Sequence, residues 1–407
     1  MSSAIVAQLR ELLGAEGVER DPRGLPRAVP GSADALAAVC AAARREGWRV
    51  RLEGRGSWLV PDAPADLVLS TRGLAGPPLI HPADLVATVP AGIPFAALQA
   101  ELARHGTWLA LDPPGRPDRT VGSVAATGTA GPLRHGFGPV RDHVLGCLVA
   151  TGDGRLVEAG GRVVKNVAGY DLTKLHVGGF GGFGVITSLH LRLRALPAAD
   201  LTLLARAGRD RLTEGAGQIL ALGPGPAALE LLSPALAASP DWVLAVRFLG
   251  TGAWVEAEAA RVEREVPLGW ERLTRDRAAT FWNLVARASL GGPVTLRAGV
   301  AMDGLEEALD LFTERLDAGL LATGPGTGTL RWAGETDAAT LRRLRREAAV
   351  REIPVTLERA PWALRAAVGH FGAYREGVGA LVEKLRATFD PGSVISVALE
   401  EPPEGHR

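Results

Sequence analysis

Residues 161–171 bring together side-chain types that this chain otherwise uses very little. The segment holds one of three lysines, one of two asparagines and one of two tyrosines: Lys165, Asn166 and Tyr170. Lysine supplies a compact ammonium group, and asparagine carries a donor and an acceptor on a short side chain. Taken alone, the segment is equally consistent with local chemistry and with a polar turn.

Two other stretches are rich in glycine and could bring the backbone close to a ligand. Residues 53–58 read Glu-Gly-Arg-Gly-Ser-Trp, and their two glycines leave backbone N–H groups open. Such a loop either turns tightly or holds an anion. Residues 120–131 are almost entirely Gly, Ala, Ser, Thr and Val. They would admit a bulky ligand, but they suit tight helix packing equally well.

A third glycine-rich stretch imitates a nucleotide motif. Glycines 179, 181 and 184 have the spacing of the dinucleotide fingerprint, which requires a helix to follow. Here Leu189, Leu191 and Leu193 alternate with polar residues, which predicts a strand with one buried face. The pattern therefore argues against a Rossmann fold. The loop 324–328 lacks the lysine of a phosphate-binding P-loop and is interpreted as a turn.

Length and charge narrow the class of protein. With 407 residues the chain exceeds one ordinary hydrophobic core, so two or three domains are expected. Its 45 basic and 45 acidic residues balance, which argues against binding nucleic acid or an anionic membrane through net charge. No apolar run predicts a transmembrane segment or a secretory signal, so we expect a cytoplasmic protein. Cys40 and Cys147 are predicted to be small buried hydrophobes.

The elements that would position these loops can be predicted from periodicity. Ser32 is expected to cap a helix that ends at Gly47. A strand at 48–52 leads into the first glycine-rich loop, and residues 112–117 form a further loop. Other predicted elements are a strand at 85–89, a helix carrying Phe95, Leu98 and Leu102, a hairpin of 144–150 with 156–159, alternating helices and strands over 200–355, and a helix at 374–389 broken by Asp390-Pro391-Gly392.

These residues together resemble a known family. The three glycine-rich loops resemble the flavin-binding domain of the vanillyl-alcohol oxidase and p-cresol methylhydroxylase (PCMH-type) family. Residues 131–146 and 161–172 more narrowly resemble the E subunits of bacterial glycolate oxidases. The resemblance covers residues 28–197 well and later appears only in places such as 354–361.

The resemblance implies a fold and a cofactor. The implied fold is α+β, with a PCMH-type FAD-binding domain of two α+β subdomains (1–197), a smaller α+β cap domain (198–360) and a C-terminal segment (361–407) that packs on the FAD domain. The implied FAD-binding residues are Gly54, Arg55, Gly56, Ser57, Trp58, Pro114, Thr120, Val121, Gly122, Ser123, Ala126, Gly128, Gly131, Gly184, Val185 and Ile186. Some relatives tether the flavin through a histidine where Ser57 and Trp58 stand, so FAD is expected to be noncovalent.

Other departures limit what the resemblance implies. Residues 394–397 replace an Asn-Pro-Gly run near the flavin ring, so the surroundings of the ring are left open. The D subunit has closely spaced metal-binding histidines, whereas His370 is the one histidine between 200 and 400, so no metal is predicted. No catalytic residue is assigned. His135, His143 and His176 lie near the flavin loops, and Arg297 could point into the cleft to bind a carboxylate.

Three functions remain open at this stage. The first is an FAD-binding subunit of a glycolate oxidase complex, whose partners would be a D-type flavoprotein subunit, an iron–sulfur subunit and a small 2-hydroxy acid. Such a complex allows peripheral membrane association. The second is a self-sufficient FAD-dependent oxidoreductase of another hydroxy acid or alcohol, and the third is a flavin-free scaffold subunit.

Overall fold

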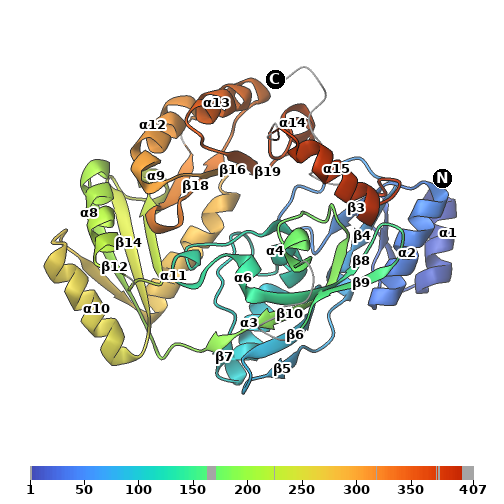
Figure 1. Cartoon of the computed structure of the whole chain (residues 1–407), viewed down its shortest axis with the longest axis horizontal. Coiled ribbons are helices and arrows are strands. Elements are labelled where there is room, and N and C mark those ends of the chain that lie inside the picture. Colours follow the sequence, from blue (N-terminus) through green and yellow to red (C-terminus); the bar gives the residue numbers. More distant parts are fainter. Residues whose placement is uncertain are drawn as a thin grey trace.

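The computed structural model describes residues 2–162, 171–223, 225–317, 319–372, 374 and 376–396. Lys165, Asn166 and Tyr170 lie outside this range. Within it the chain forms two five-stranded sheets, a two-stranded pair and one eight-stranded sheet. The first half of the chain builds the two five-stranded sheets apart from one C-terminal strand, and the second half builds the eight-stranded sheet (Figure 1).

The first five-stranded sheet carries the loop that opens the candidate site. Its order is β1 (Val18–Arg20), β2 (Pro26–Ala28), β4 (Leu67–Ser70), β3 (Val50–Glu53) and β20 (Ile395–Ser396). Helices α1 (Ser2–Leu13) and α2 (Ala33–Glu46) pack on it. The predicted caps of α2 are confirmed, because the Ser32 side chain accepts from the Ala35 N–H and Gly47 is left-handed at φ 69°. Cys40 is buried in α2 as a free thiol.

The second five-stranded sheet is entirely antiparallel. Its order is β5 (Leu79–His81), β6 (Val86–Pro90), β10 (Val185–Arg192), β8 (Val144–Ala150) and β9 (Leu156–Gly160). The predicted hairpin of β8 and β9 is confirmed, and so is the strand after the glycine run. Leu189 and Leu191 of β10 pack on Val121 and Val124 of α4 (Val121–Thr127), with α3 (Phe95–Arg104) nearby. Cys147 is buried in β8 as a free thiol.

Short elements join these sheets to the rest. They are β7 (Thr107–Trp108) paired with β11 (Arg194–Ala195), and the helices α5 (Arg134–Phe137), α6 (Val140–His143) and α7 (Thr173–His176).

The eight-stranded sheet occupies the second half of the chain and is antiparallel throughout the strand pairs described. Its order is β15 (Glu271–Thr274), β12 (Ala199–Ala207), β14 (Trp242–Gly250), β13 (Ala228–Leu232), β17 (Leu320–Gly324), β18 (Thr329–Gly334), β16 (Val294–Gly299) and β19 (Val355–Arg359). One core on this sheet includes α8 (Arg209–Ala221), α10 (Gly252–Glu265), α12 (Leu305–Arg315) and α13 (Ala338–Val350), and another includes α9 (Pro234–Ala237) and α11 (Arg275–Arg287). Figure 1 shows the first four helices along the outer side of the sheet.

The C-terminal segment returns to the first sheet. It forms α14 (Trp362–Val368) and α15 (Val378–Phe389), and α15 starts four residues later than the predicted Tyr374. The Asp390-Pro391-Gly392 break is confirmed, and β20 then pairs in parallel with β3. The α+β architecture with a returning C-terminal segment is therefore confirmed. The division at residues 197 and 360 remains our proposal.

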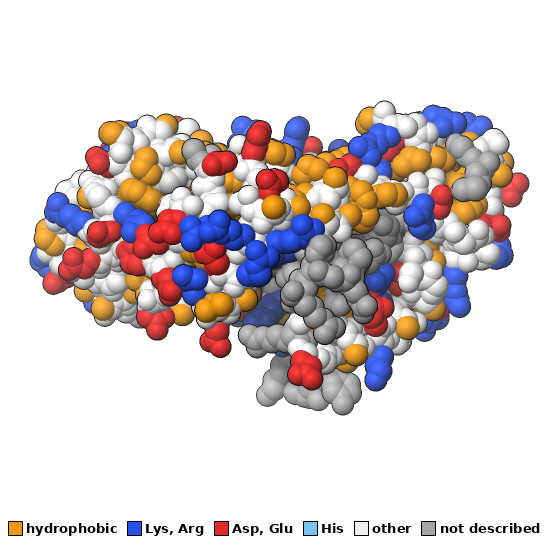
Figure 2. All heavy atoms as spheres, turned by 90° about the horizontal axis from the view of Figure 1, so that it is seen from above, with side chains coloured by type: hydrophobic (Ala, Val, Ile, Leu, Met, Phe, Trp, Pro, Cys, Tyr) orange, Lys and Arg blue, Asp and Glu red, His pale blue; other side chains and the backbone are white. Residues whose placement is uncertain are grey.

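The surface differs between the two halves of the molecule. Seen from above, acidic and basic side chains are mixed over the left half, which holds α8, α10 and α12 (Figure 2). Apolar side chains gather further right, in the region of α14 and α15, where Leu381 of α15 is 57% exposed. No helix among the described residues is long and apolar enough to span a membrane.

Candidate flavin cleft and the adjoining cavity

A cleft of about 1110 Å³ opens where the first glycine-rich loop faces α4 and the start of β10. We call it the glycine-lined cleft. Eleven of the sixteen predicted cofactor residues line it: Gly54, Arg55, Gly56, Ser57, Trp58, Gly122, Ser123, Ala126, Gly184, Val185 and Ile186. Its walls also include Phe180, Trp362 and Arg365. Three sequence segments and the C-terminal segment therefore meet at one hollow.

The first loop presents an open row of backbone donors to the cleft. The N–H groups of Arg55, Gly56, Ser57 and Trp58 make no hydrogen bond with the described residues. Gly56 is left-handed at φ 67°, a conformation that glycine adopts without strain. Consecutive N–H groups in such a turn form a concave binding site for an anion. The loop thus has the donor set that a pyrophosphate needs.

The second glycine-rich stretch is a short helix with a loop after it. Thr120 caps α4, because its hydroxyl accepts from the Ser123 N–H at 3.2 Å. The Val121 and Gly122 N–H groups donate to Ile93 and Ala91 carbonyls at 2.9 and 2.8 Å. These donors are used inside the protein, so α4 contributes shape to the cleft while the first loop contributes donors.

Glycine is required where α4 meets its neighbours. A Cβ on Gly54 would lie 2.4 Å from the Thr120 hydroxyl, and one on Gly122 would lie 2.7 Å from the Ala91 Cβ. Val121 is buried, and Gly128 ends α4 in the left-handed region at φ 60°. Thr120, Val121 and Gly128 thus hold the cleft wall in place but do not line it. Their predicted contact with FAD remains a prediction.

Trp58 and Arg119 form the floor between the cleft and the second half of the chain. Trp58 is 3% exposed, and its indole Nε1 has no hydrogen-bond partner among the described residues. The Arg119 guanidinium lies 4.3 Å from the centre of the Trp58 ring. Arg119 is 1% exposed and donates to the Pro114 carbonyl at 2.8 Å and to Ser123 and Thr127. Burial lowers the pKa of this arginine to about 9.

The far wall is the glycine run that precedes β10. Gly184 has φ 113°, and a Cβ there would lie 2.6 Å from the Val149 Cγ1. Phe180 is left-handed at φ 52°, and its ring packs edge-on against His370 with centroids 4.3 Å apart. The run therefore shapes the cleft through close packing, without the helix that a dinucleotide fingerprint needs.

The histidines noted in the sequence do not face the cleft. His135, His143 and His176 line neither the glycine-lined cleft nor the cavity described next. Burial lowers the pKa of each, to about 4 for His176. His176 packs edge-on against Phe389, which is a structural position. None of the three is placed to take a proton from a ligand in the cleft.

A second cavity, of about 540 Å³, adjoins this floor, and we call it the Glu230 cavity. The first half of the chain supplies Asp112, Pro114 and residues 130–132, and the eight-stranded sheet supplies Glu230 and Arg331. Two predicted FAD-binding residues, Pro114 and Gly131, lie here and do not line the glycine-lined cleft. The segment after α4 thus separates the two hollows: Thr127 lines the cleft, and Ala130 lines the cavity.

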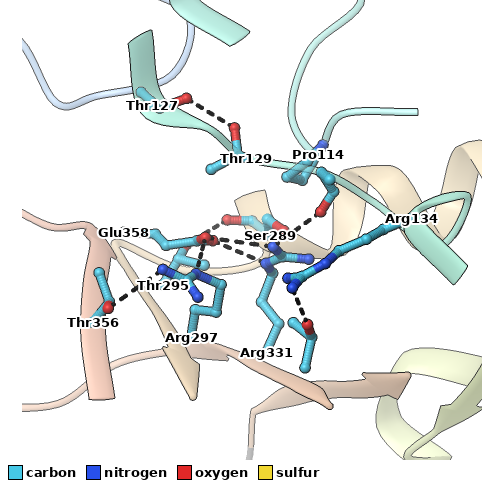
Figure 3. A network of polar contacts seen from close by, with 12 residues as sticks. Pro114, Thr127, Thr129, Arg134, Ser289, Thr295, Arg297, Arg331, Thr356 and Glu358 are labelled. Carbon is cyan, nitrogen blue, oxygen red and sulfur yellow. Dashed lines mark hydrogen bonds and ion pairs between the residues drawn. The ribbon is translucent and has the colours of Figure 1, made fainter. Parts of the chain in front are cut away.

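An ion network stands beside the Glu230 cavity (Figure 3). Glu358 is 1% exposed and accepts from Arg297 and from Arg331, each Nε lying 2.9 Å from a carboxylate oxygen. Burial opposes ionisation of Glu358 most strongly, but Arg331 and Arg297 together keep its pKa below the usual value. Arg331 also reaches the Ala130 carbonyl at 3.3 Å, and Arg134 reaches the Thr329 hydroxyl at 3.3 Å. The network therefore links the two halves of the chain.

The proposed role of Arg297 can now be compared with its position. Arg297 is held by Glu358 and Thr356 and does not line either hollow. Arg331, on the neighbouring strand and directly paired with it, lines the Glu230 cavity instead. Sequence reasoning missed Arg331 and Glu230. The signal for each was a charged residue inside a strand of buried apolar residues: Leu330-Arg331-Trp332 and Leu229-Glu230-Leu231.

The fold and the cleft define the class of protein. Residues 27–160 match the family model described as an FAD binding domain. The fold resembles that of alkyldihydroxyacetonephosphate synthase, with a TM-score of 0.73 at 14% identity, covering 98% of this chain and 86% of that one. Residues 27–160 form an FAD-binding domain of the PCMH type, and FAD is the cofactor of such a domain.

Three curated proteins are similar to part of this chain. The chain is 42% identical over 123 residues to "Glycolate oxidase subunit GlcE" of Escherichia coli, covering 30% of this chain and 35% of that protein. It is 32% identical over 161 residues to "Glycolate oxidase subunit GlcD" of Bacillus subtilis, covering 39% and 34%. It is 32% identical over 197 residues to a D-2-hydroxyglutarate dehydrogenase of Xanthomonas citri, covering 47% and 42%. The matches thus span less than half the length of these relatives.

Proposed function

We propose that this chain is an FAD-binding subunit of a glycolate oxidase complex, with a D-type flavoprotein subunit and an iron–sulfur subunit as its partners. The observation that carries the proposal is the glycine-lined cleft with its four open N–H groups, in a chain that is similar over 123 residues to GlcE. Arg55, Gly56, Ser57 and Trp58 would hold the pyrophosphate, and α4 with residues 184–186 would enclose the rest. When bound, FAD supplies the hydride acceptor for oxidation of a hydroxy acid.

The remaining site residues would hold the flavin and shape the cleft around it. No side chain at residues 54–58 offers the histidine that a covalent flavin link would use, so we propose noncovalent FAD. Arg365 would close the cleft from the C-terminal side, because Asp62 fixes its guanidinium at 2.7 Å. The Trp58 Nε1 would donate to the flavin and so gain the partner that it lacks in the protein.

A second candidate is a self-sufficient FAD-dependent oxidoreductase of another hydroxy acid or alcohol. One observation favours it: the Glu230 cavity holds an arginine, a buried carboxyl group and a partly buried one next to the flavin-binding half of the chain. A self-sufficient enzyme needs such groups to bind a substrate and to move its hydroxyl proton.

The test of flavin binding is the visible absorption spectrum of the purified chain, repeated on the supernatant after acid precipitation. We expect a flavin spectrum of about one FAD per chain, released by acid. A Gly54→Ala variant should lose most of the flavin, because its new Cβ would displace Thr120. Gly76→Ala is the matched control, since nothing lies within 4 Å of that Cβ. A colourless chain that takes up no added FAD would contradict the proposal and leave a scaffold subunit.

The test of the complex is dye reduction by glycolate. The chain co-expressed with the D-type and iron–sulfur subunits should reduce the dye with glycolate, whereas omitting this chain should abolish turnover. Full turnover without it would overturn the assignment. Turnover of a hydroxy acid by the isolated chain would favour the self-sufficient enzyme.

A further inference from the structure

The Glu230 cavity lies among positively charged side chains, which the sequence alone did not predict. Arg331 is tied to Glu358 through Nε and Nη2, while its Nη1 makes no hydrogen bond with the described residues. Glu358 shares its single charge between Arg331 and Arg297. Arg119 and Arg134 add their charges to the same region. One ionised carboxylate therefore faces four guanidinium groups, and the region has an excess of positive charge.

The two carboxyl groups that line the cavity offset only part of this excess at neutral pH. Burial raises the pKa of Glu230 to about 8, against the opposing effect of Arg331. Burial likewise raises the pKa of Asp112 to about 7, against Arg247, Leu133 and Arg331. The groups that act on Glu230 from the neighbouring elements are Arg331 and Asp112. Below about pH 8 Glu230 is therefore mostly a neutral proton donor.

Glu230 is also a buried polar group without a protein partner. It is 7% exposed, and its carboxyl makes no hydrogen bond with the described residues. The carboxyl lies over Gly324 of β17, where a Cβ would be 2.8 Å from its Oε1. A Cβ on Gly131 would likewise lie 2.7 Å from the Asp112 Oδ1, and this carboxylate accepts from the Leu133 N–H. The carboxyl oxygens of Glu230 stay accessible from the cavity, so they are open to a hydrogen bond with a ligand that enters it.

We propose that the Glu230 cavity binds a small carboxylate of the hydroxy-acid or oxo-acid class, with Arg331 binding the carboxylate and Glu230 donating a hydrogen bond to it. This inference rests on the proposed function. It adds that the substrate binds to this chain as well as to the partner subunits of the complex. An arginine suits the task because its planar fork matches a carboxylate. Residues from both halves of the chain enclose the cavity, which favours a small ligand.

The test is calorimetric titration of the flavin-loaded full chain with oxalate. Oxalate carries carboxylates but no carbinol carbon, so binding is measured without turnover. We expect Arg331→Lys to weaken binding about tenfold or more, because the fork is lost. Arg297→Lys is the matched control: it alters the other arginine of Glu358, which does not line the cavity, and should stay within about twofold. Equal losses in the two variants, or no binding by the parent chain, would overturn the proposal.

A second measurement separates binding from general destabilisation. Oxalate affinity of the parent should fall as pH rises above about 8, where Glu230 loses its proton and repels the anion. Glu230→Gln keeps a donor but cannot ionise, so its affinity should fall less than that of the parent between pH 7 and pH 9. Asp112 and Arg119 titrate in both proteins and account for the decline that remains. The same decline in both proteins would contradict the role of Glu230.

The outcomes also distinguish this inference from the proposed function. If the complex oxidises glycolate but the chain binds no oxalate, the function stands and the cavity is a structural junction. If the chain binds oxalate through Arg331 but the complex does not oxidise glycolate, the carboxylate site stands and the substrate is another acid.

Discussion

At the scale of single residues, the cleft depends on polar groups that the protein leaves without partners. The open N–H groups of residues 55–58 and the Trp58 Nε1 cost free energy when water is excluded, unless a ligand satisfies them. A protein keeps such unsatisfied groups where the binding of a ligand recovers their cost in free energy. The glycine-rich sequence predicted the loop, but it could not show that the matching donors of α4 are already used by Ala91 and Ile93.

Replacing Trp58 is predicted to raise the stability of the flavin-free protein and to lower its affinity for FAD. Trp58→Phe keeps a ring beneath Arg119 but removes the unpartnered N–H. The flavin-free protein should become more stable by about 1 kcal/mol, because a buried donor is no longer unsatisfied. FAD affinity should fall roughly two- to tenfold, the value of one hydrogen bond. Urea unfolding of the flavin-free chain and FAD titration would measure the two effects.

The control for this prediction is Trp254→Phe. Trp254 lies on α10 and is 40% exposed, away from the cleft. It should change neither quantity. An unchanged FAD affinity in Trp58→Phe would show that the indole N–H does not contact the cofactor.

At the scale of elements, one side chain fixes the last turn of the C-terminal segment. Asp390 is 2% exposed and accepts from the Val394 and Ile395 N–H groups, each at 3.0 Å. This fixes the turn that sends β20 alongside β3, the strand that leads into the first loop. The sequence predicted a break at Asp390, but pairing of strands about 340 residues apart depends on tertiary contacts.

Asp390→Ala should therefore loosen β20 and β3 together. We expect a loss of about 2–3 kcal/mol in unfolding free energy, because two buried N–H groups lose their acceptor. Hydrogen exchange at residues 50–52 and 394–395 should accelerate. Asp337→Ala removes a cap of α13 on the eight-stranded sheet and should leave exchange in β3 unchanged. Slow exchange in β3 of Asp390→Ala would show that β20 is held by other contacts.

At the scale of the whole molecule, the two halves join through polar contacts around the Glu230 cavity. Arg331 reaches Ala130, the Gly115 N–H donates to Ala286 at 2.9 Å, and the Gly136 N–H donates to Ala227 at 3.0 Å. Protonation of Glu230 and Asp112 should therefore affect the stability of the assembled chain. Their folded-state pKa values, about 8 and about 7, lie above the ordinary values.

The pH dependence follows from the direction of these shifts. A raised carboxyl pKa means that the folded protein holds the proton more tightly, so its stabilisation is full below about pH 4.5 and is lost as pH rises towards about 8. Glu230→Gln resembles the protonated form. It should match the parent near pH 5 and exceed it by a few kcal/mol, at about 1.4 kcal/mol per pKa unit, near pH 8.

Urea unfolding at pH 5, 6.5 and 8 would check this prediction, with Glu16→Gln on the exposed surface as the control. Only the difference between parent and variant is informative, because groups far from Glu230 titrate equally in both. A difference that does not change with pH would show that Glu230 ionises normally in the folded protein.

The sequence by itself determined the local elements and the class of cofactor. Caps at Ser32 and Gly47, the alternation after Gly184 and the glycine loops are set by neighbouring residues, so they could be predicted from spacing. The tertiary structure alone decided which donors remain open and which charges meet. Arg331, Glu230 and Asp112 are far apart in the chain and come together only when the eight-stranded sheet closes against the flavin-binding half. Their chemistry depends on burial, and burial is a property of the assembled molecule.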